Sequence, residues 1–175
     1  MEIARLTPAH VSEYRALMLG AYAAEPDAFT STVAEREPLP LDWWISRVSD
    51  EPSPEQRVLG AFVDGQLVGV AGLAFENRER TRHKATLFGM FVLPEFRGEG
   101  VARRLVDGVL AEARSRAGTQ LVRLTVTESN GPAIELYESC GFRPFGTEPL
   151  ALRVGERFVA KIHMWCSIDP QPGRE

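Results

Sequence analysis

Arg97-Gly98-Glu99-Gly100-Val101-Ala102-Arg103 is the most informative stretch of the chain, because it marks a crossing from a strand to a helix. Before it, the β-rich run Ala85 to Leu93 ends at Pro94, which cannot continue a ladder. After it, Gly100 to Ala117 carries apolar residues at intervals of four, which predicts a helix with one buried face. Glycine permits close approach of the backbone, and the free N–H groups of a helix start attract polyanions. The stretch therefore predicts a phosphate or pyrophosphate site, with a purely structural turn as the alternative.

Two familiar nucleotide loops do not match this crossing. A Walker A loop needs Gly-Lys followed by Ser or Thr, which is absent here. The dinucleotide pattern GxGxxG is incomplete because position 103 is Arg. The identity of the ligand must therefore be inferred from other residues of the chain.

Working outward from the crossing, the chain predicts an α+β (α/β) fold of three layers. Asp64-Gly65 joins two β-rich runs and is a strong hairpin signal. Strands are expected at Glu2–Leu6, Arg57–Val63, Gln66–Phe75, Ala85–Leu93, Leu121–Thr127, Phe142–Phe145 and Phe158–Trp165. Besides Gly100–Ala117, helices are expected from Pro8 to about Ala23 and over Leu41–Val48 and Ala133–Ser139. This order predicts one central, mixed and mostly antiparallel sheet of six to seven strands with about four helices.

Length and composition indicate one domain over residues 1–175. The net charge of −4 argues against a general nucleic-acid binder. No apolar stretch is long enough to span a bilayer, so we expect no membrane partner and a cytoplasmic protein. Cys140 and Cys166 have no metal-ligand spacing, so we expect free thiols and no metal. The oligomeric state stays open, a homodimer included.

The charges are unevenly distributed along the chain. Up to Gln56 there are four Arg against ten Asp and Glu, whereas Arg97 to Arg116 holds five Arg against three acidic residues. This pattern suits a protein that binds a cation on one side and an anion on the other, although ordinary solvated surfaces explain it equally well.

With these residues in view, the chain resembles the Gcn5-related N-acetyltransferase (GNAT) superfamily. Its signature Q/R-x-x-G-x-G/A is matched by Arg97, Gly100 and Ala102. A second signature is similar to Asn130-x-x-Ala133-Ile134-x-Leu136-Tyr137-Glu138-x-x-Gly141-Phe142. The resemblance covers residues 85–142 closely, as an acetyl-CoA-binding core, and the remainder through element order only.

The resemblance implies that acetyl-CoA is the co-substrate and lies in a V-shaped opening between the strands that end near Val92 and Thr127. The backbone of Met90, Phe91 and Val92 would hold the pantetheine arm, and Gly98 to Arg103 would cradle the pyrophosphate. The full set of donor-binding residues carried over is Met90, Phe91, Val92, Arg97, Gly98, Glu99, Gly100, Val101, Ala102, Arg103, Asn130 and Tyr137.

The implied reaction moves the acetyl group directly to a primary amine of a small molecule or peptide in a ternary complex. Tyr137 is the expected general acid for the departing thiolate. The general base stays open, because Thr125 stands where some relatives carry Glu. Glu128 is the first candidate for this base, and Glu76 and His83 are the alternatives.

The amine acceptor is expected near the first two helices, where the acidic excess favours a cationic molecule or a basic peptide end. Trp43 and Trp44 are candidates for its pocket, with at least one of them packed in the core. Two other functions stay open. One is a catalytically silent acetyl-CoA sensor or interaction module, and the other is a nucleotide-phosphate-binding interaction domain.

Overall fold

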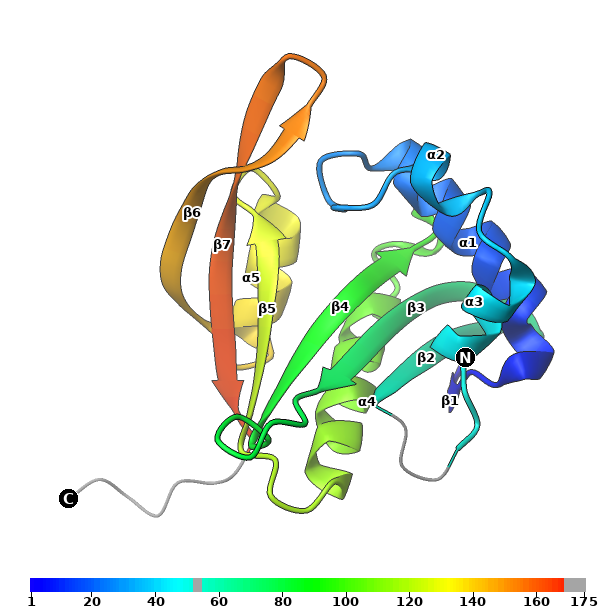
Figure 1. Cartoon of the computed structure of the whole chain (residues 1–175), viewed down its shortest axis with the longest axis horizontal. Helices are drawn as coiled ribbons and strands as arrows, with labels where there is room; N and C mark the ends of the chain where they lie inside the picture. The colour runs from blue at the N-terminus through cyan, green and yellow to red at the C-terminus, as the bar shows by residue number, and fades with distance from the viewer. Residues whose placement is uncertain (52–54, 169–175) are drawn as a thin grey trace.

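The computed structural model describes residues 1–51 and 55–168. Its centre is a seven-stranded sheet with the order β1-β2-β3-β4-β5-β7-β6 (Figure 1). The strands are β1 (Glu2–Arg5), β2 (Gln56–Val63), β3 (Gln66–Phe75), β4 (Lys84–Val92), β5 (Leu121–Thr127), β6 (Arg143–Val154) and β7 (Arg157–Ser167). The helices are α1 (Val11–Ala24), α2 (Val33–Arg36), α3 (Leu41–Arg47), α4 (Val101–Ser115) and α5 (Gly131–Ser139), with 3-10 turns η1 (Pro8–His10) and η2 (Pro94–Phe96). The predicted mixed, mostly antiparallel α/β fold is confirmed.

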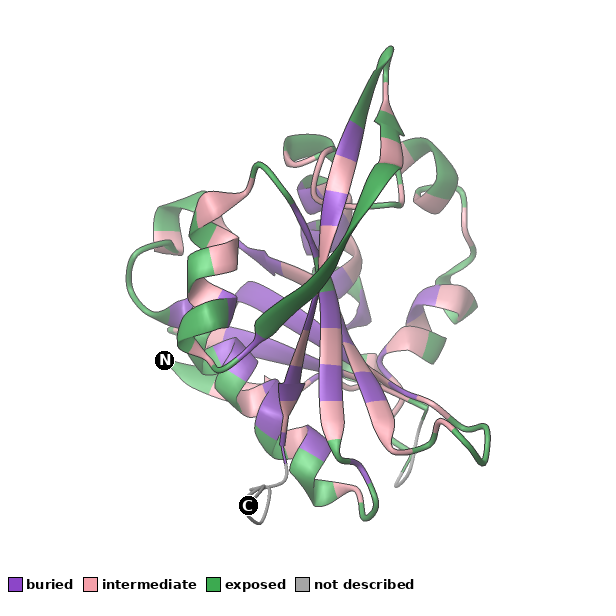
Figure 2. Ribbon diagram, turned by 90° about the vertical axis from the view of Figure 1, so that its left-hand side faces the viewer, coloured by how far each residue is buried: buried purple, intermediate pink, exposed green. Residues whose placement is uncertain are grey.

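Helices cover both faces of the sheet and build two separate cores. On one face, α1 and α3 pack against β2, β3 and β4 around Tyr14, Met18 and Trp44. On the other face, α4 and α5 enclose a larger core that contains Leu105 and Phe142 (Figure 2). The apolar stripe read from the sequence of α4 is the face that this core buries.

The hairpin predicted at Asp64-Gly65 is present. Both residues have positive φ, 49° and 81°, as a type I′ turn requires. The turn joins β2 and β3, which pair antiparallel from Gln56↔Ala74 to Val63↔Gln66. Free thiols at Cys140 and Cys166 are also confirmed.

The sheet opens at its centre, between β4 and β5. These two strands are its one parallel pair, and they are in register only at Lys84↔Leu121, Ala85↔Val122 and Thr86↔Arg123. Beyond Thr86 they diverge, and Figure 1 shows the gap widening between the two ribbons. The V-shaped opening expected from the resemblance is therefore part of the fold.

Three elements, β6, β7 and α2, differ from the prediction. β6 and β7 are much longer than the runs Phe142–Phe145 and Phe158–Trp165, and Phe142 itself is a buried core residue before β6. β6 is an edge strand with two register shifts and is exposed along most of its length, so it lacks the alternation that marks a half-buried strand (Figure 2). The short helix α2 was also missed, although the capping box of Thr32 and Glu35 is a recognisable signal for its start.

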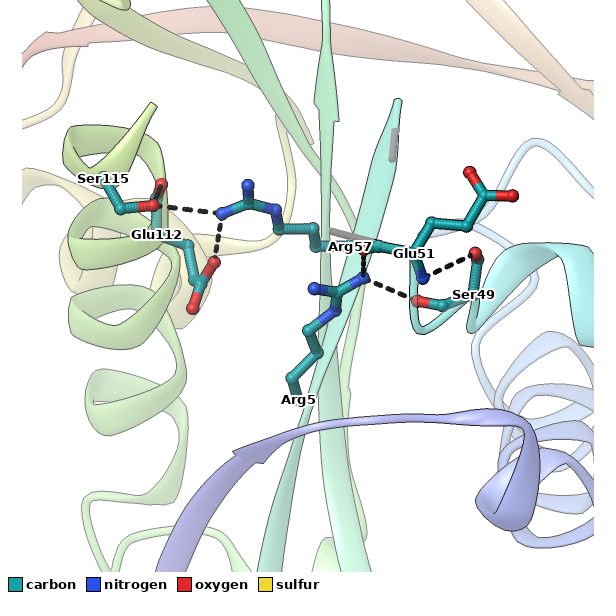
Figure 3. A network of polar contacts seen from close by, with 6 residues as sticks. All are labelled: Arg5, Ser49, Glu51, Arg57, Glu112 and Ser115. Carbon is teal, nitrogen blue, oxygen red and sulfur yellow. Dashed lines mark hydrogen bonds and ion pairs between the residues drawn. The ribbon is translucent and has the colours of Figure 1, made fainter. Parts of the chain in front are cut away.

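Polar contacts join the edge of the sheet to its helical layers. Arg57 on β2 donates to the carboxylate of Glu112 and the hydroxyl of Ser115 on α4 (Figure 3). Arg5 on β1 donates to the carbonyl oxygens of Ser49 and Glu51, just after α3. The same edge of the sheet is thus fixed to the helices on both faces.

Residues 1–51 and 55–168 contain neither a membrane-spanning helix nor a cluster of metal-binding side chains. None of their helices is long and apolar enough to cross a bilayer. No group of three or more His, Cys, Asp or Glu side chains in these ranges is placed to hold a metal ion.

The adjacent tryptophans of α3 test the packing directly. Trp44 is 1% exposed and stacks edge-on against Tyr14, whereas Trp43 is half-buried. We expect Trp44→Ala to lower the free energy of unfolding by about 3–5 kcal/mol, because it leaves a cavity in the core. Trp43→Ala is the matched control and should cost clearly less. Urea unfolding of the two variants measures the difference, and equal losses would contradict this assignment.

Candidate active site

A single cleft of about 1120 Å³ runs through the opening between β4 and β5 and reaches both faces of the sheet. Its two ends have different linings. One end is formed by η2, the start of α4, and α5, and is here called the donor end. The other is formed by α1, the segment 25–32, α2, α3 and the strands β6 and β7, and is here called the acceptor end.

The donor end contains the strand-to-helix crossing. Gly98 and Gly100 have φ values of +82° and +80°, and a Cβ atom added to either would meet nothing within 4 Å. The N–H groups in the first turn of a helix have no intrahelical partner, and no side chain of the N-cap residue Gly100 satisfies those of α4, where Gly100, Ala102 and Arg103 line the cleft. Two glycines beside an open helix start form a cradle that fits a phosphate group.

The other predicted donor-binding residues divide into two groups. The cleft is lined by Met90, Phe91, Val92, Arg97, Gly98, Gly100, Ala102, Arg103, Asn130 and Tyr137. Glu99 and Val101 do not line it, since Glu99 is exposed and the side chain of Val101 is 1% exposed within the core. Any contact from Val101 must come from its backbone.

Arg97 and Asn130 also have structural roles. Arg97 donates to the carbonyl oxygen of Val92 (3.0 Å) and to the carboxylate of Glu25 (2.9 Å). The side-chain oxygen of Asn130 accepts from the N–H of Ala133 at 3.2 Å and caps α5. Both side chains therefore shape the cleft wall with groups that are already hydrogen-bonded.

A bulge in β4 provides free backbone at the centre of the cleft. Val70 and Gly72 on β3 pair with Phe91 and Phe88, which leaves Gly89 and Met90 opposite Ala71. Gly89 has a φ of +60°, and the pairing with β5 has already ended at Thr86. The polar backbone groups of this bulge are thus available to a ligand lying along the strand.

Tyr137 extends from α5 into the same region. Its side chain is 7% exposed, lines the cleft and donates from the hydroxyl to the sulfur of Met90 at 3.4 Å. Burial raises the pKa of Tyr137 well above its ordinary value. The phenol therefore stays protonated at neutral pH, as a proton donor must.

The acceptor end is cationic. Arg36 and Arg47 lie against the ring of Trp43, with guanidinium carbons 4.6 Å and 5.1 Å from its centroid. Arg47 also lies over Phe88, at 5.4 Å. Among the described residues that line the cleft, Glu25 is the one acidic side chain, and it is paired with Arg97. The acidic excess of the N-terminal segment thus lies outside the cleft, contrary to the expectation of a cation-binding pocket.

The segment 25–32 bridges the two halves of the opened sheet. Glu25 pairs with Arg97 on the β4 side, and the carbonyl oxygen of Asp27 accepts from the Thr127 hydroxyl (2.6 Å) on the β5 side. Lys161 on β7 donates to Thr127 Oγ1 (2.9 Å) and to the carbonyl oxygen of Ala28 (3.0 Å). Burial lowers the pKa of Lys161. These bonds hold the segment across one edge of the acceptor end.

The three base candidates taken from the sequence all lie outside the cleft lining. Glu128 is exposed, and its N–H donates to the carbonyl oxygen of Ala160 as the chain leaves β5. Glu76 is paired with Arg123, and the carbonyl oxygen of His83 accepts from Gln120 at the closed end of the opening.

Sequence reasoning missed His163 on β7, which lines the cleft and whose Nε2 is 2.9 Å from Oε2 of Glu148 on β6. The available signal was the spacing of two residues that puts Lys161, His163 and Trp165 on one face of β7. The irregular sequence of β6 did not allow its residues, Glu148 among them, to be aligned with that face.

Comparison with known proteins agrees with this geometry. A sequence model described as the Acetyltransferase (GNAT) family matches residues 18–142. The chain belongs to this family. It is therefore an acetyl-CoA-dependent N-acetyltransferase, as GNAT proteins are.

The relatives cover the chain to different extents. The L-amino acid N-acetyltransferase AaaT of Escherichia coli (strain K12) is 33% identical over 135 residues, 76% of this chain and 80% of that protein. N-acetyltransferase 8 of Rattus norvegicus is 37% identical over 100 residues, 57% of this chain and 45% of that protein. The match to the rat protein therefore spans less than half of that relative.

Solved structures share the fold. A GNAT family acetyltransferase from Streptococcus pneumoniae superposes with a TM-score of 0.82 at 22% identity, covering 96% of this chain and 99% of the other. The yncA protein of Salmonella typhimurium, solved with its cofactor acetyl-CoA, superposes with a TM-score of 0.80 at 19% identity, covering 100% and 98%. We propose that the glycine cradle and the free backbone of the β4 bulge in this GNAT protein receive the pyrophosphate and the amide-bearing arm of acetyl-CoA.

The glycine cradle gives a direct test of donor binding. In Gly100→Ala, a methyl group would enter the open space at the helix start, and the positive φ would cost about 1–2 kcal/mol of stability. Gly118→Ala is the matched control, because Gly118 has a φ of +85°, open space around it and no place in the cleft lining. We expect both variants to lose similar stability in thermal unfolding, and only Gly100→Ala to weaken acetyl-CoA binding by about tenfold or more in calorimetry. Equal affinities in the two variants would contradict the cradle.

Proposed function

We propose that this GNAT protein transfers the acetyl group of acetyl-CoA directly to the primary amine of a small molecule that also carries a carboxylate, such as an amino acid. The observation that carries the proposal is the acceptor end, where Arg36 and Arg47 face the cleft without a carboxylate partner among the described residues. An amino acid has both groups that this cleft requires, because its amine can be acetylated while its carboxylate pairs with arginine.

Arg47 is the stronger of the two anion-binding candidates. Its Nε is buried and has no hydrogen-bond partner within the described part of the chain. An unpaired buried donor costs about 1–3 kcal/mol, and a ligand oxygen would recover part of that cost. The planar guanidinium matches a carboxylate in two parallel hydrogen bonds. Arg36 differs, because its Nε and Nη2 already donate to the hydroxyl of Ser31.

Trp43 and Phe88 support the arginines rather than bind a cationic substrate. Their rings lie under the guanidinium of Arg47, and Trp43 also lies under that of Arg36. Such stacking holds the charges in place while leaving guanidinium edges free to donate. The name of the Escherichia coli relative, an L-amino acid N-acetyltransferase, supports the same acceptor class.

Tyr137 is the proposed general acid. Acetyl-CoA supplies the thioester, and the thiolate that leaves needs a proton. The Tyr137 hydroxyl lies 3.4 Å from the sulfur of Met90, beside the unpaired bulge of β4, and burial keeps it protonated. A catalytically silent acetyl-CoA sensor would bind the donor equally well but would not depend on this hydroxyl.

Removal of the hydroxyl tests the chemistry. We expect Tyr137→Phe to lower kcat by roughly tenfold to ten-thousandfold, with the KM for acetyl-CoA changed little, because the ring still packs against Phe142. Release of the CoA thiol, followed over a panel of amines, measures kcat. Thermal unfolding with and without acetyl-CoA shows that the donor still binds. Unchanged turnover would refute the role of Tyr137, and donor binding without thiol release by the wild type would favour the sensor.

Neutralising Arg47 tests the acceptor class. A hydrogen bond to a charged group contributes about 1.5–3 kcal/mol, so Arg47→Gln should raise the KM for a carboxylate-bearing amine by roughly 10- to 150-fold. The KM for the matching neutral amide should hardly change, so the preference for the acid is lost. Arg15→Gln, an α1 variant outside the cleft that carries the same change, is the control. A wild type that acetylates the amide as well as the acid would rule out this acceptor class.

A further inference from the structure

The imidazole of His163 and the carboxylate of Glu148 form a hydrogen-bonded pair at the acceptor end. The two side chains come from neighbouring strands, β7 and β6, and the distance from Nε2 to Oε2 is 2.9 Å. The ring of Phe145 lies edge-on to the imidazole, with centroids 5.8 Å apart. His163 and Phe145 both line the cleft, and the His163 side chain is 35% exposed. The imidazole is thus held by two neighbours and still open to the cleft.

The position of His163 follows from the register of the sheet. Thr125 on β5 pairs directly with His163 on β7, so the two side chains lie on the same face. Thr125 is exposed, lines the cleft and has no titratable group. The imidazole therefore lies one strand away from Thr125, on the side of the sheet that receives the amine.

The other titratable groups of the lining do not suit the role of base. Glu25 is paired with Arg97, and Lys161 donates to Thr127 and Ala28. Burial raises the pKa of Tyr14 to about 12, so it holds its proton. Within the described residues of the cleft, His163 is the remaining side chain whose type ordinarily exchanges a proton between pH 5 and 8.

Resting on the function proposed above, we propose that His163 is the general base of the transfer and that Glu148 positions it. The carboxylate of Glu148 accepts from Nε2–H, so the neutral imidazole presents Nδ1 as its proton acceptor. The amine nitrogen forms the C–N bond as the C–S bond breaks. The proton leaving nitrogen goes to Nδ1, the departing thiolate takes one from Tyr137, and exchange with water restores both groups.

The charged groups around His163 come from each strand packed beside it. They are Glu148 on β6, Lys161 two residues away on β7 and Arg123 next to Thr125 on β5. Arg123 is neutralised by Glu76, whereas Glu148 contacts the imidazole directly. An imidazole that already carries two protons cannot accept one from the amine, so activity through this base should fall as the pH is lowered.

The test compares His163→Gln, Glu148→Gln and the control His83→Gln, which makes the same change outside the cleft lining. We expect His163→Gln to lower kcat/KM about 10²- to 10⁴-fold. In the pH profile of kcat/KM, the decline toward low pH should then reflect only protonation of the amine substrate and no longer that of His163. Glu148→Gln should lower kcat/KM less and keep the contribution of His163 to that decline, while His83→Gln should match the wild type. In His163→Ala, added imidazole should restore part of the rate, which a merely structural role would not allow.

Acetyl-CoA binding, measured by thermal shift, should be the same in all these variants, because the donor end is untouched. A His163→Gln protein that keeps its kcat/KM within about twofold and its pH profile would overturn the proposal while leaving the acetyltransferase function intact. An active His163→Ala protein without imidazole rescue would reduce His163 to a packing role. A wild type that binds acetyl-CoA but acetylates no amine would overturn both proposals together.

Discussion

The short parallel pairing of β4 and β5 is the constraint on which the rest of this protein depends. Three register pairs hold the two strands together, and beyond Thr86 they separate. Beyond this point β4 carries the bulge at Gly89 in its pairing with β3, while β5 stays paired with β7 along its other edge. Backbone groups that would normally pair within a sheet are left for a ligand. The opening in the sheet, the unpaired backbone groups and the cleft thus all result from the separation of β4 and β5.

Both ends of the cleft depend on segments that lie across this opening. The donor end needs the unprotected start of α4, and the acceptor end needs the segment 25–32, which ties β4 to β5 and β7. The ammonium group of Lys161 donates to carbonyl oxygens of that segment, whereas the buried Nε of Arg47 has no hydrogen-bond partner among the described residues. Charge inside the cleft, rather than the net charge of a segment of sequence, therefore decides which acceptor is attracted.

In the proposed reaction, the proton donor and the proton acceptor lie on opposite faces of the sheet. Tyr137 approaches from α5 and is kept protonated by burial, while His163 approaches from β7 and is half-exposed beside Glu148. An acid and a base in such different environments can act at the same pH. Tyr137 and His163 meet in one cleft because β7 pairs with β5, so this arrangement depends on the order of the strands.

The sequence by itself determined the fold class and the candidates for the donor end and the proton donor, because each rests on local signals. Asp64-Gly65, the periodicity of α4 and the glycines at 98 and 100 act through neighbouring residues and dihedral angles. Only the tertiary structure decided which side chains line the acceptor end, and so which residue is proposed as the base. Glu128 is close to the site in sequence yet turns outward after β5, whereas His163 reaches the cleft because β7 inserts beside β5. Long-range strand pairing, which composition and periodicity do not encode, sets which side chains meet.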